Sequence, residues 1–287
     1  MKRCLIFSFL LPLALAPKAF AAESTPSTNK TEKAEVSIFR DKNLEKAVRK
    51  FVFEKRDNDQ PITETDVASL STIEGKGMQI KDLSGLEKCH SLASLDLAKN
   101  AITNLAPIKE LTSIQYLNLA NNQIGDITPL SNIKALQYIE LSNNQVKDLQ
   151  PLSGLTNMAS LYLTSNQVAD ISAITNFPKL SSLYLDKNKI SSVNGVENLK
   201  WLSSLSLNDN QITNITPIAS LNGLYYLFLE RNKIKDITPL FDAAKKDSEG
   251  EKRFSPYINI FIAGNPLSST AKRQLSQMKD FGCRINN

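Results

Sequence analysis

The strongest constraint on how this chain can fold is an asparagine that returns every 22 residues. Seven copies follow one another without insertion, and an eighth comes after a longer step. A fixed period of this length indicates a repeat architecture in which each copy is one supersecondary unit. These positions, called here the asparagine ladder, are Asn100, Asn122, Asn144, Asn166, Asn188, Asn210, Asn232 and Asn265.

Apolar residues recur with the same step. Two aliphatic side chains separated by one residue precede each ladder asparagine, as Leu95 and Leu97 precede Asn100. One coil of this size cannot bury its own apolar residues, whereas stacked coils share an interior that continues along the axis. The sequence therefore predicts a solenoid with a strand in every coil. Prolines in register predict 3₁₀ or irregular turns on the return side, at Pro107, Pro129, Pro151, Pro217 and Pro239.

The repeated pattern LxxLxLxxNxI resembles the leucine-rich repeat, and its 22-residue form followed by "ITPL" resembles the bacterial internalin-type repeat. The likeness covers about residues 37–287. It implies an α/β solenoid, namely a leucine-rich repeat right-handed superhelix with a concave parallel β-sheet. The convex side would consist mostly of 3₁₀ and irregular turns, with a helical N-terminal cap and a C-terminal capping helix.

The asparagine ladder is interpreted as structural. An asparagine side chain carries both an acceptor and two donors, so it can satisfy backbone groups of its own coil and of the adjacent turn. Buried polar groups persist only when they are paired in this way. A second in-register column could bind calcium through stacked carboxylates, but we favour the interpretation that each member caps its own turn. This column is Asp82, Asn104, Asp126, Asp148, Asp170, Asn214 and Asp236.

The chain divides into segments that differ in composition. Residues 1–21 have a basic start, a short apolar stretch and an Ala19-Phe20-Ala21 site, which predict a secretory signal peptide. Asp41 is expected to start a helix whose apolar face includes Leu44 and Val48. The expected organisation is a signal peptide (1–21), a disordered leader (22–36), a helical N-terminal cap (37–72), about eight coils of leucine-rich repeats (73–267) with a charged insert near 241–256, and a C-terminal cap (268–287).

Charge and chemistry exclude several classes of function. Loss of Lys2, Arg3 and Lys18 with the signal peptide reduces 34 basic residues to 31, against 29 acidic ones, so the net charge falls to +2. A nucleic-acid partner then lacks electrostatic support. We expect no enzyme, no cofactor and no metal, because His90 is the only histidine and no nucleophile motif or phosphate-binding loop is present. Cys89 is interpreted as a buried hydrophobe, and Cys283 as either free or paired with another chain.

The sheet face turned away from the core carries the candidate binding site. Side chains of a strand alternate between two faces, so the residues flanking each buried leucine point outward. Stacked coils then align tyrosines and one phenylalanine that the core does not need, and exposed aromatic side chains are typical of binding hot spots. Trp201 falls outside these positions and is interpreted as packing. The predicted partner-binding residues are Tyr116, Tyr138, Glu140, Tyr162, Tyr184, Asp186, Tyr226, Phe228, Glu230 and Arg231.

These observations predict an exported, non-enzymatic protein that recognises another protein through its concave face. The location expected is the periplasm, the cell surface or the medium, with no integral membrane segment in the mature chain and a monomeric state. Binding of a glycan or cell-envelope polysaccharide by the same aromatic face is the alternative. A third possibility is a structural envelope protein without a discrete ligand. Stacking of neighbouring rings along the sheet remains the competing reason for the tyrosines.

Overall fold

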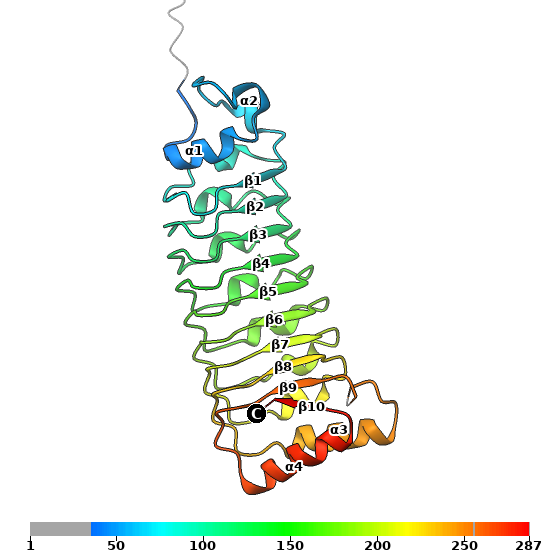
Figure 1. The fold of residues 1–287 in the computed structure, drawn as a ribbon. Coiled ribbons are helices and arrows are strands. Elements are labelled where there is room, and N and C mark those ends of the chain that lie inside the picture. Colours follow the sequence, from blue (N-terminus) through cyan, green and yellow to red (C-terminus); the bar gives the residue numbers. More distant parts are fainter. Residues whose placement is uncertain (1–35, 255, 287) are drawn as a thin grey trace, which may run out of the picture. The chain divides into compact units, whose positions relative to one another are not determined.

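The computed structural model describes residues 36–254 and 256–286, so the predicted signal peptide and all but the last residue of the predicted leader lie outside them. The described part contains ten parallel strands, and each strand pairs with the next one in the chain (Figure 1). They are β1 (Thr72–Glu74), β2 (Ser94–Asp96), β3 (Tyr116–Asn118), β4 (Tyr138–Glu140), β5 (Ser160–Tyr162), β6 (Ser182–Tyr184), β7 (Ser204–Ser206), β8 (Tyr226–Phe228), β9 (Asn259–Phe261) and β10 (Arg284–Asn286).

The register of the sheet follows the sequence period. Residues one repeat apart face each other across neighbouring strands, as Leu117 does with Leu95 and Ile139. The central residue of β1 to β9 is fully buried, while its two neighbours face away from the core. The solenoid and its concave parallel sheet are therefore confirmed. Nine strands lie between residues 72 and 261, against about eight expected coils, because the degenerate first coil also forms a strand.

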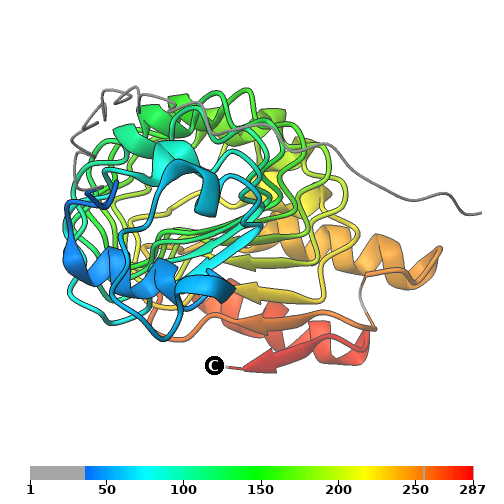
Figure 2. The same cartoon turned by 90° about the horizontal axis from the view of Figure 1, so that it is seen from above.

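Short 3₁₀ turns return the chain on the opposite side of the coil. In Figure 2, seen along the stack, these turns and the strands lie on different sides of the common interior. Proline occupies the first turn of several of them, where its missing N–H costs nothing. The 3₁₀ turns of the return side, with and without proline, are Leu86–Lys88, Ala106–Ile108, Thr128–Leu130, Gln150–Leu152, Ser172–Asn176, Val196–Asn198 and Thr216–Ser220.

The asparagine ladder satisfies the backbone where each strand ends. Asn144 accepts a hydrogen bond from the Ile124 N–H (2.9 Å) and donates to the carbonyls of Leu119 (2.9 Å) and Leu141 (2.9 Å). Asn265 makes the equivalent bonds, although the step that leads to it is longer than the others. The amide thus links two successive coils through backbone groups of both.

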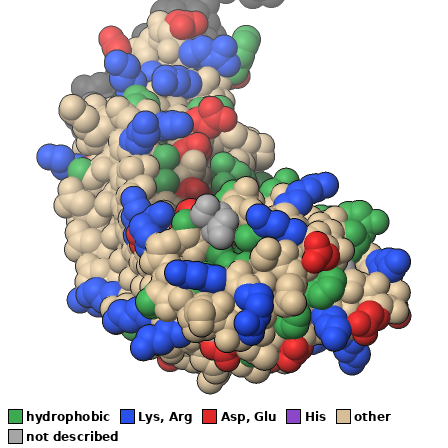
Figure 3. Space-filling view, turned by 60° about the horizontal axis from the view of Figure 1, so that its bottom comes forward, with side chains coloured by type: hydrophobic (Ala, Val, Ile, Leu, Met, Phe, Trp, Pro, Cys, Tyr) green, Lys and Arg blue, Asp and Glu red, His purple; other side chains and the backbone are tan. Residues whose placement is uncertain are grey.

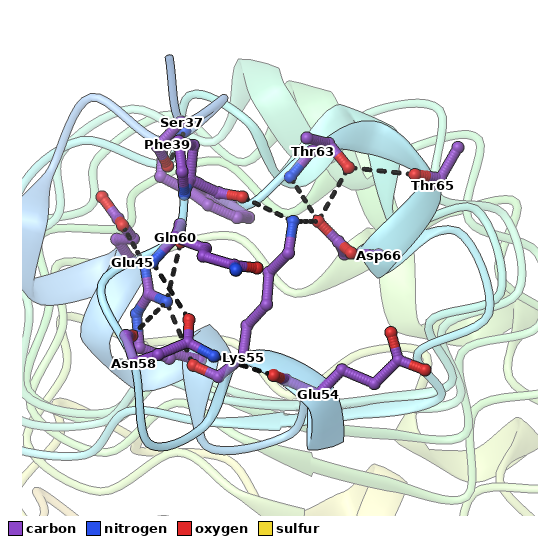
Figure 4. A network of polar contacts seen from close by, with 12 residues as sticks. Ser37, Phe39, Glu45, Glu54, Lys55, Asn58, Gln60, Thr63, Thr65 and Asp66 are labelled. Atoms are coloured by element: carbon purple, nitrogen blue, oxygen red, sulfur yellow. Dashed lines mark hydrogen bonds and ion pairs between the residues drawn. The ribbon is translucent and has the colours of Figure 1, made fainter. Parts of the chain in front are cut away.

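A helical cap covers the first strand, as expected. Helix α1 (Lys42–Arg49) begins at Asp41, whose carboxylate accepts the N–H groups of Asn43 and Leu44, and it packs on β1. Helix α2 (Glu64–Val67) and a 3₁₀ turn (Phe53–Lys55) follow. Polar contacts hold the segment between these elements, where Lys55 binds Asp66 at 2.6 Å (Figure 4).

The C-terminal end differs from the sequence expectation in one element. The charged insert folds as helix α3 (Thr238–Glu249), and the expected capping helix is α4 (Ser269–Asp280). The residues after α4 were expected to be a tail, but Arg284–Asn286 form β10, which pairs in parallel with β9. This strand brings Cys283 into the core with 4% exposure. Burial raises the pKa of its thiol to about 11. Of the two alternatives left open for Cys283, the structure shows the free and buried thiol. In the described part of the chain, no helix is long and apolar enough to span a membrane.

Candidate functional site

Four tyrosines form a continuous stack on the concave face. Ring centroids lie 4.5 Å apart for Tyr116 and Tyr138, 5.3 Å for Tyr138 and Tyr162, and 5.0 Å for Tyr162 and Tyr184. We call these four residues the tyrosine stack. It crosses from the first outward position of β3 and β4 to the second outward position of β5 and β6. The structure therefore brings these four predicted site residues together.

The rings lie where they do because of strand geometry and not because the core requires them. Each tyrosine flanks a fully buried aliphatic residue, Leu117 in the case of Tyr116 and Ile139 in the case of Tyr138. Neighbouring parallel strands lie about 4.8 Å apart, which matches the spacing of stacked rings. Each ring is half-buried against its neighbours and keeps part of its edge in solvent. Stacking along the sheet and availability for a partner thus coexist.

Burial and nearby carboxylates raise the pKa of two hydroxyl groups of the stack. Burial and the nearby Asp96 charge raise the pKa of Tyr116, and burial with the neighbouring Tyr116 and Glu140 raises that of Tyr138 further. Both hydroxyls therefore stay protonated at neutral pH, so each can donate and accept hydrogen bonds.

A second aromatic group lies on the last coils. Phe228 stacks on Phe261 with centroids 4.5 Å apart, and Tyr226 lies 6.2 Å from Phe228. Between this group and the tyrosine stack runs β7, which presents Ser204 and the buried Ser206 instead of rings. The predicted aromatic residues thus form two groups separated by one strand. Phe261 follows from the sequence only when the longer step before the last ladder asparagine is allowed for.

The predicted polar residues are engaged within the protein. Glu140 accepts the Ser142 N–H at 2.7 Å, and Asp186 accepts the Ser206 hydroxyl at 2.6 Å and the Asn208 N–H at 2.7 Å.

Arg231 binds both carboxylate oxygens of Asp209, at 2.6 and 2.9 Å, and lies 3.6 Å from Glu230. These hydrogen bonds from Arg231 lower the pKa of Asp209. Sequence reasoning missed Asp209, although it stands one repeat before Arg231 and so faces it from the neighbouring coil.

Other aromatic residues lie exposed at the edge of the face. Trp201 is 74% exposed, which makes its interpretation as a packing residue wrong. It precedes β7, and the equivalent residue of the next coil is Gly223, which offers no side chain to cover it. Tyr225 and Tyr257 are about half exposed and their rings lie 6.4 Å apart. Figure 3 shows apolar and acidic side chains gathered together in a hollow of the protein surface.

The aspartate column caps turns. Asp126 accepts the Thr128 N–H at 2.8 Å, and Asp148 accepts that of Gln150 at the same distance. The other members make the same bond to the residue two positions on. The preferred interpretation of this column is confirmed. Within residues 36–254 and 256–286, no cluster of three or more His, Cys, Asp or Glu side chains could hold a metal ion.

Comparison of the sequence with protein families finds one matching description, "Leucine Rich repeats (2 copies)". Successive matches cover residues 90–132, 112–154, 134–176, 156–201 and 200–242, which together are more than half of the chain. Comparison with curated proteins returns no match.

Among solved structures, internalin C2 from Listeria monocytogenes is similar with a TM-score of 0.69 and 28% identity, over 80% of this chain and 95% of that one. An internalin (inlF) from the same species has a TM-score of 0.65 and 23% identity, over 87% and 92%. The repeat ectodomain of the plant receptor kinase GASSHO1/SCHENGEN3 from Arabidopsis thaliana, solved in complex with CASPARIAN STRIP INTEGRITY FACTOR 2, has a TM-score of 0.57 and 21% identity, over 70% and 24%. The last two likenesses show the fold alone.

Proposed function

The chain belongs to the leucine-rich repeat family, of the bacterial internalin type, and we therefore propose that it recognises another protein through the concave face of its sheet. Proteins with repeats of this kind are generally protein-binding scaffolds. The proposal further holds that the protein is non-enzymatic and monomeric. Its binding residues are the tyrosine stack together with Tyr226 and Phe228, and its nearby polar groups set specificity.

The single observation that carries this proposal is the tyrosine stack. Four large rings occupy outward positions of adjacent strands, although serine serves equally well at the same positions in other coils, such as Ser182 and Ser204. The core therefore does not select them. Aromatic side chains contribute large contact areas with few rotatable bonds, which is why they dominate the energetics of protein interfaces.

Glycan binding is the second candidate, because sugar rings also stack on exposed aromatic side chains and hydrogen-bond to amides and carboxylates. The pair favouring it is Asn118 and Asp96, linked at 3.1 Å beside the Tyr116 ring. Free sugars at millimolar concentration would compete with a glycan ligand and would leave a protein ligand bound. A structural envelope protein would bind neither.

The test is a pull-down from envelope and culture extracts with the mature protein and with a Tyr138→Ala, Tyr162→Ala, Tyr184→Ala triple variant. A matched control replaces an exposed aromatic residue of the N-terminal cap, Phe53→Ala. Circular dichroism and thermal unfolding first establish that both variants are folded. We expect one partner to be retained by the wild type and the control and lost by the triple variant. Equal recovery of partners by all three proteins would contradict binding at the stack.

Export is the second part of the proposal and depends on residues 1–21. A basic start, an apolar stretch and the Ala19-Phe20-Ala21 site support cleavage before residue 22. N-terminal sequencing of the protein recovered from the envelope or medium should begin at Ala22. Recovery of the uncleaved chain from the cytoplasm would contradict export.

A further inference from the structure

We propose that the partner presents lysine or arginine side chains to the part of the concave face formed by β2 to β6. This inference rests on the proposed function and names the chemistry of the segment that binds there. Two observations support it: the parts of the tyrosine stack that remain accessible, and the carboxylates that lie beside the stack.

Stacking leaves the tyrosines a restricted set of open surfaces. The inner ring faces are covered by neighbouring rings at 4.5 to 5.3 Å. Apart from the outer faces of the two end rings, Tyr116 and Tyr184, the accessible parts are therefore the ring edges and the hydroxyl groups. Ring edges form an apolar strip on which an alkyl stem can lie, and each hydroxyl oxygen can accept a hydrogen bond.

The carboxylates beside the same strands are bonded to neutral donors. Asp96 accepts bonds from the Ala98 N–H (3.0 Å) and the Asn118 amide (3.1 Å), and Glu140 accepts one from the Ser142 N–H. Asp186 is likewise bonded to neutral donors. None of the three forms an ion pair in the described part of the chain. These bonds hold the carboxylates in place beside the rings without neutralising them.

The distribution of positive charge separates this region from the rest of the face. The outward positions of β2 to β6 contain no lysine or arginine. Lys99 and Lys187 are exposed in the turns that follow β2 and β6, beyond the outward positions of those strands. Further along, Arg231 already pairs with Asp209 and Glu230. The negative charge is thus uncompensated beside the tyrosine stack and compensated beyond β7.

Long cationic side chains are complementary to this combination. Lysine and arginine bury apolar stems along hydrophobic surface while the charged head remains with polar groups. Here the stems would lie on the ring edges and the heads would reach Asp96, Glu140 or the tyrosine hydroxyls. Charge-assisted hydrogen bonds of this type are roughly twice as strong as neutral ones. An acidic segment would meet like charges on the same surface.

The test is a selection of random twelve-residue peptides displayed on phage against the mature protein. Each selected peptide is measured again on the Tyr138→Ala, Tyr162→Ala, Tyr184→Ala variant, which sorts concave-face binders from the others. We expect peptides that depend on the tyrosines to contain at least about twice the lysine and arginine of the input library, whereas the remaining peptides should not. The best tyrosine-dependent peptide is then synthesised as the probe.

Isosteric variants then test the carboxylates. Asp96→Asn with Glu140→Gln removes two charges while keeping oxygen acceptors for the Ala98 and Ser142 N–H groups. Asp126→Asn with Asp170→Asn removes the same charge from turns outside the face and is the matched control. The first pair should weaken the probe about fivefold to tenfold, and 0.5 M salt should weaken the wild type similarly. The control pair should stay within about twofold.

The outcomes separate this inference from the proposed function. Tyrosine-dependent peptides without enrichment in lysine or arginine would overturn the cationic partner and leave concave-face binding intact. Enriched peptides whose affinity is unchanged by Asp96→Asn with Glu140→Gln would overturn the role of these carboxylates. A selection that yields no tyrosine-dependent peptide would contradict both proposals.

Discussion

At the scale of single residues, the asparagine ladder links coils through polar bonds that no other side chain reproduces. Asn144 is 8% exposed and serves one N–H and two carbonyls of two successive coils. Replacement by alanine leaves these groups unpaired in the core, and each costs about 1–3 kcal/mol. We therefore expect Asn144→Ala to lower the free energy of unfolding by about 3 kcal/mol in urea titrations, allowing for partial rescue by water.

The control for this prediction is Asn132→Ala, which alters an exposed asparagine outside the ladder. That change should stay within about 0.5 kcal/mol of the wild type. Equal stability of the two variants would show that the ladder amide is not what pairs these backbone groups in solution.

At the scale of elements, one carboxylate fixes helix α1 to the first coil. Asp41 accepts the N–H groups of Asn43 and Leu44 with one oxygen and those of Lys81 (2.7 Å) and Asp82 (3.2 Å) with the other. Burial opposes ionisation, but these four bonds prevail and lower the pKa of Asp41 below its usual 3.8. We expect Asp41→Ala to destabilise the cap by about 1–2 kcal/mol and to raise hydrogen exchange in α1, while exchange in β8 and β9 is unchanged.

The same lowered pKa predicts how the cap responds to acid. A carboxyl group whose pKa is lower in the folded state stabilises it above the unfolded pKa and stops doing so as pH falls through the folded value. Protection of α1 should therefore persist at pH 5 and decline below about pH 3.8. In Asp41→Ala the decline over this interval should be smaller. A parallel decline in both proteins would assign the acid sensitivity to other carboxylates.

At the scale of the whole molecule, the coils are interchangeable units that contact mainly their neighbours. Deletion of residues 188–209 joins Lys187 to Asn210, which are consecutive in the repeat, and removes β7. We expect the shortened protein to keep its fold, with a melting temperature lower by about 2–4 °C for each kcal/mol of lost interface. Circular dichroism tests whether the fold is kept, and thermal unfolding measures the melting temperature.

Deletion of residues 188–198 alone is the control, because it removes half a coil and places polar positions opposite core columns. That variant should not fold. If deletion of the whole coil also abolished folding, the coils would depend on contacts beyond their nearest neighbours, contrary to the repeat model.

The sequence predicted the backbone features and the alignment of residues that follow from the period. It missed features that depend on side-chain conformation or on chain beyond the last repeat. Strands, buried leucines and the tyrosine stack follow from positions that are one repeat apart. Strand β10 does not, because Arg284–Asn286 lack a ladder asparagine and follow a helix. The exposure of Trp201 depends on the glycine in the next coil, and the Asp209 to Arg231 pair depends on side-chain conformation. These features required the structure.

The insertion before β9 has a consequence for how such a protein can evolve. Strands β8 and β9 remain in register, Phe228 opposite Phe261, although the chain that connects them is longer than in the other coils. The added chain leaves on the outer side as α3. A lineage can therefore gain or lose whole segments there and so acquire a new outer surface, while the proposed binding face keeps its register.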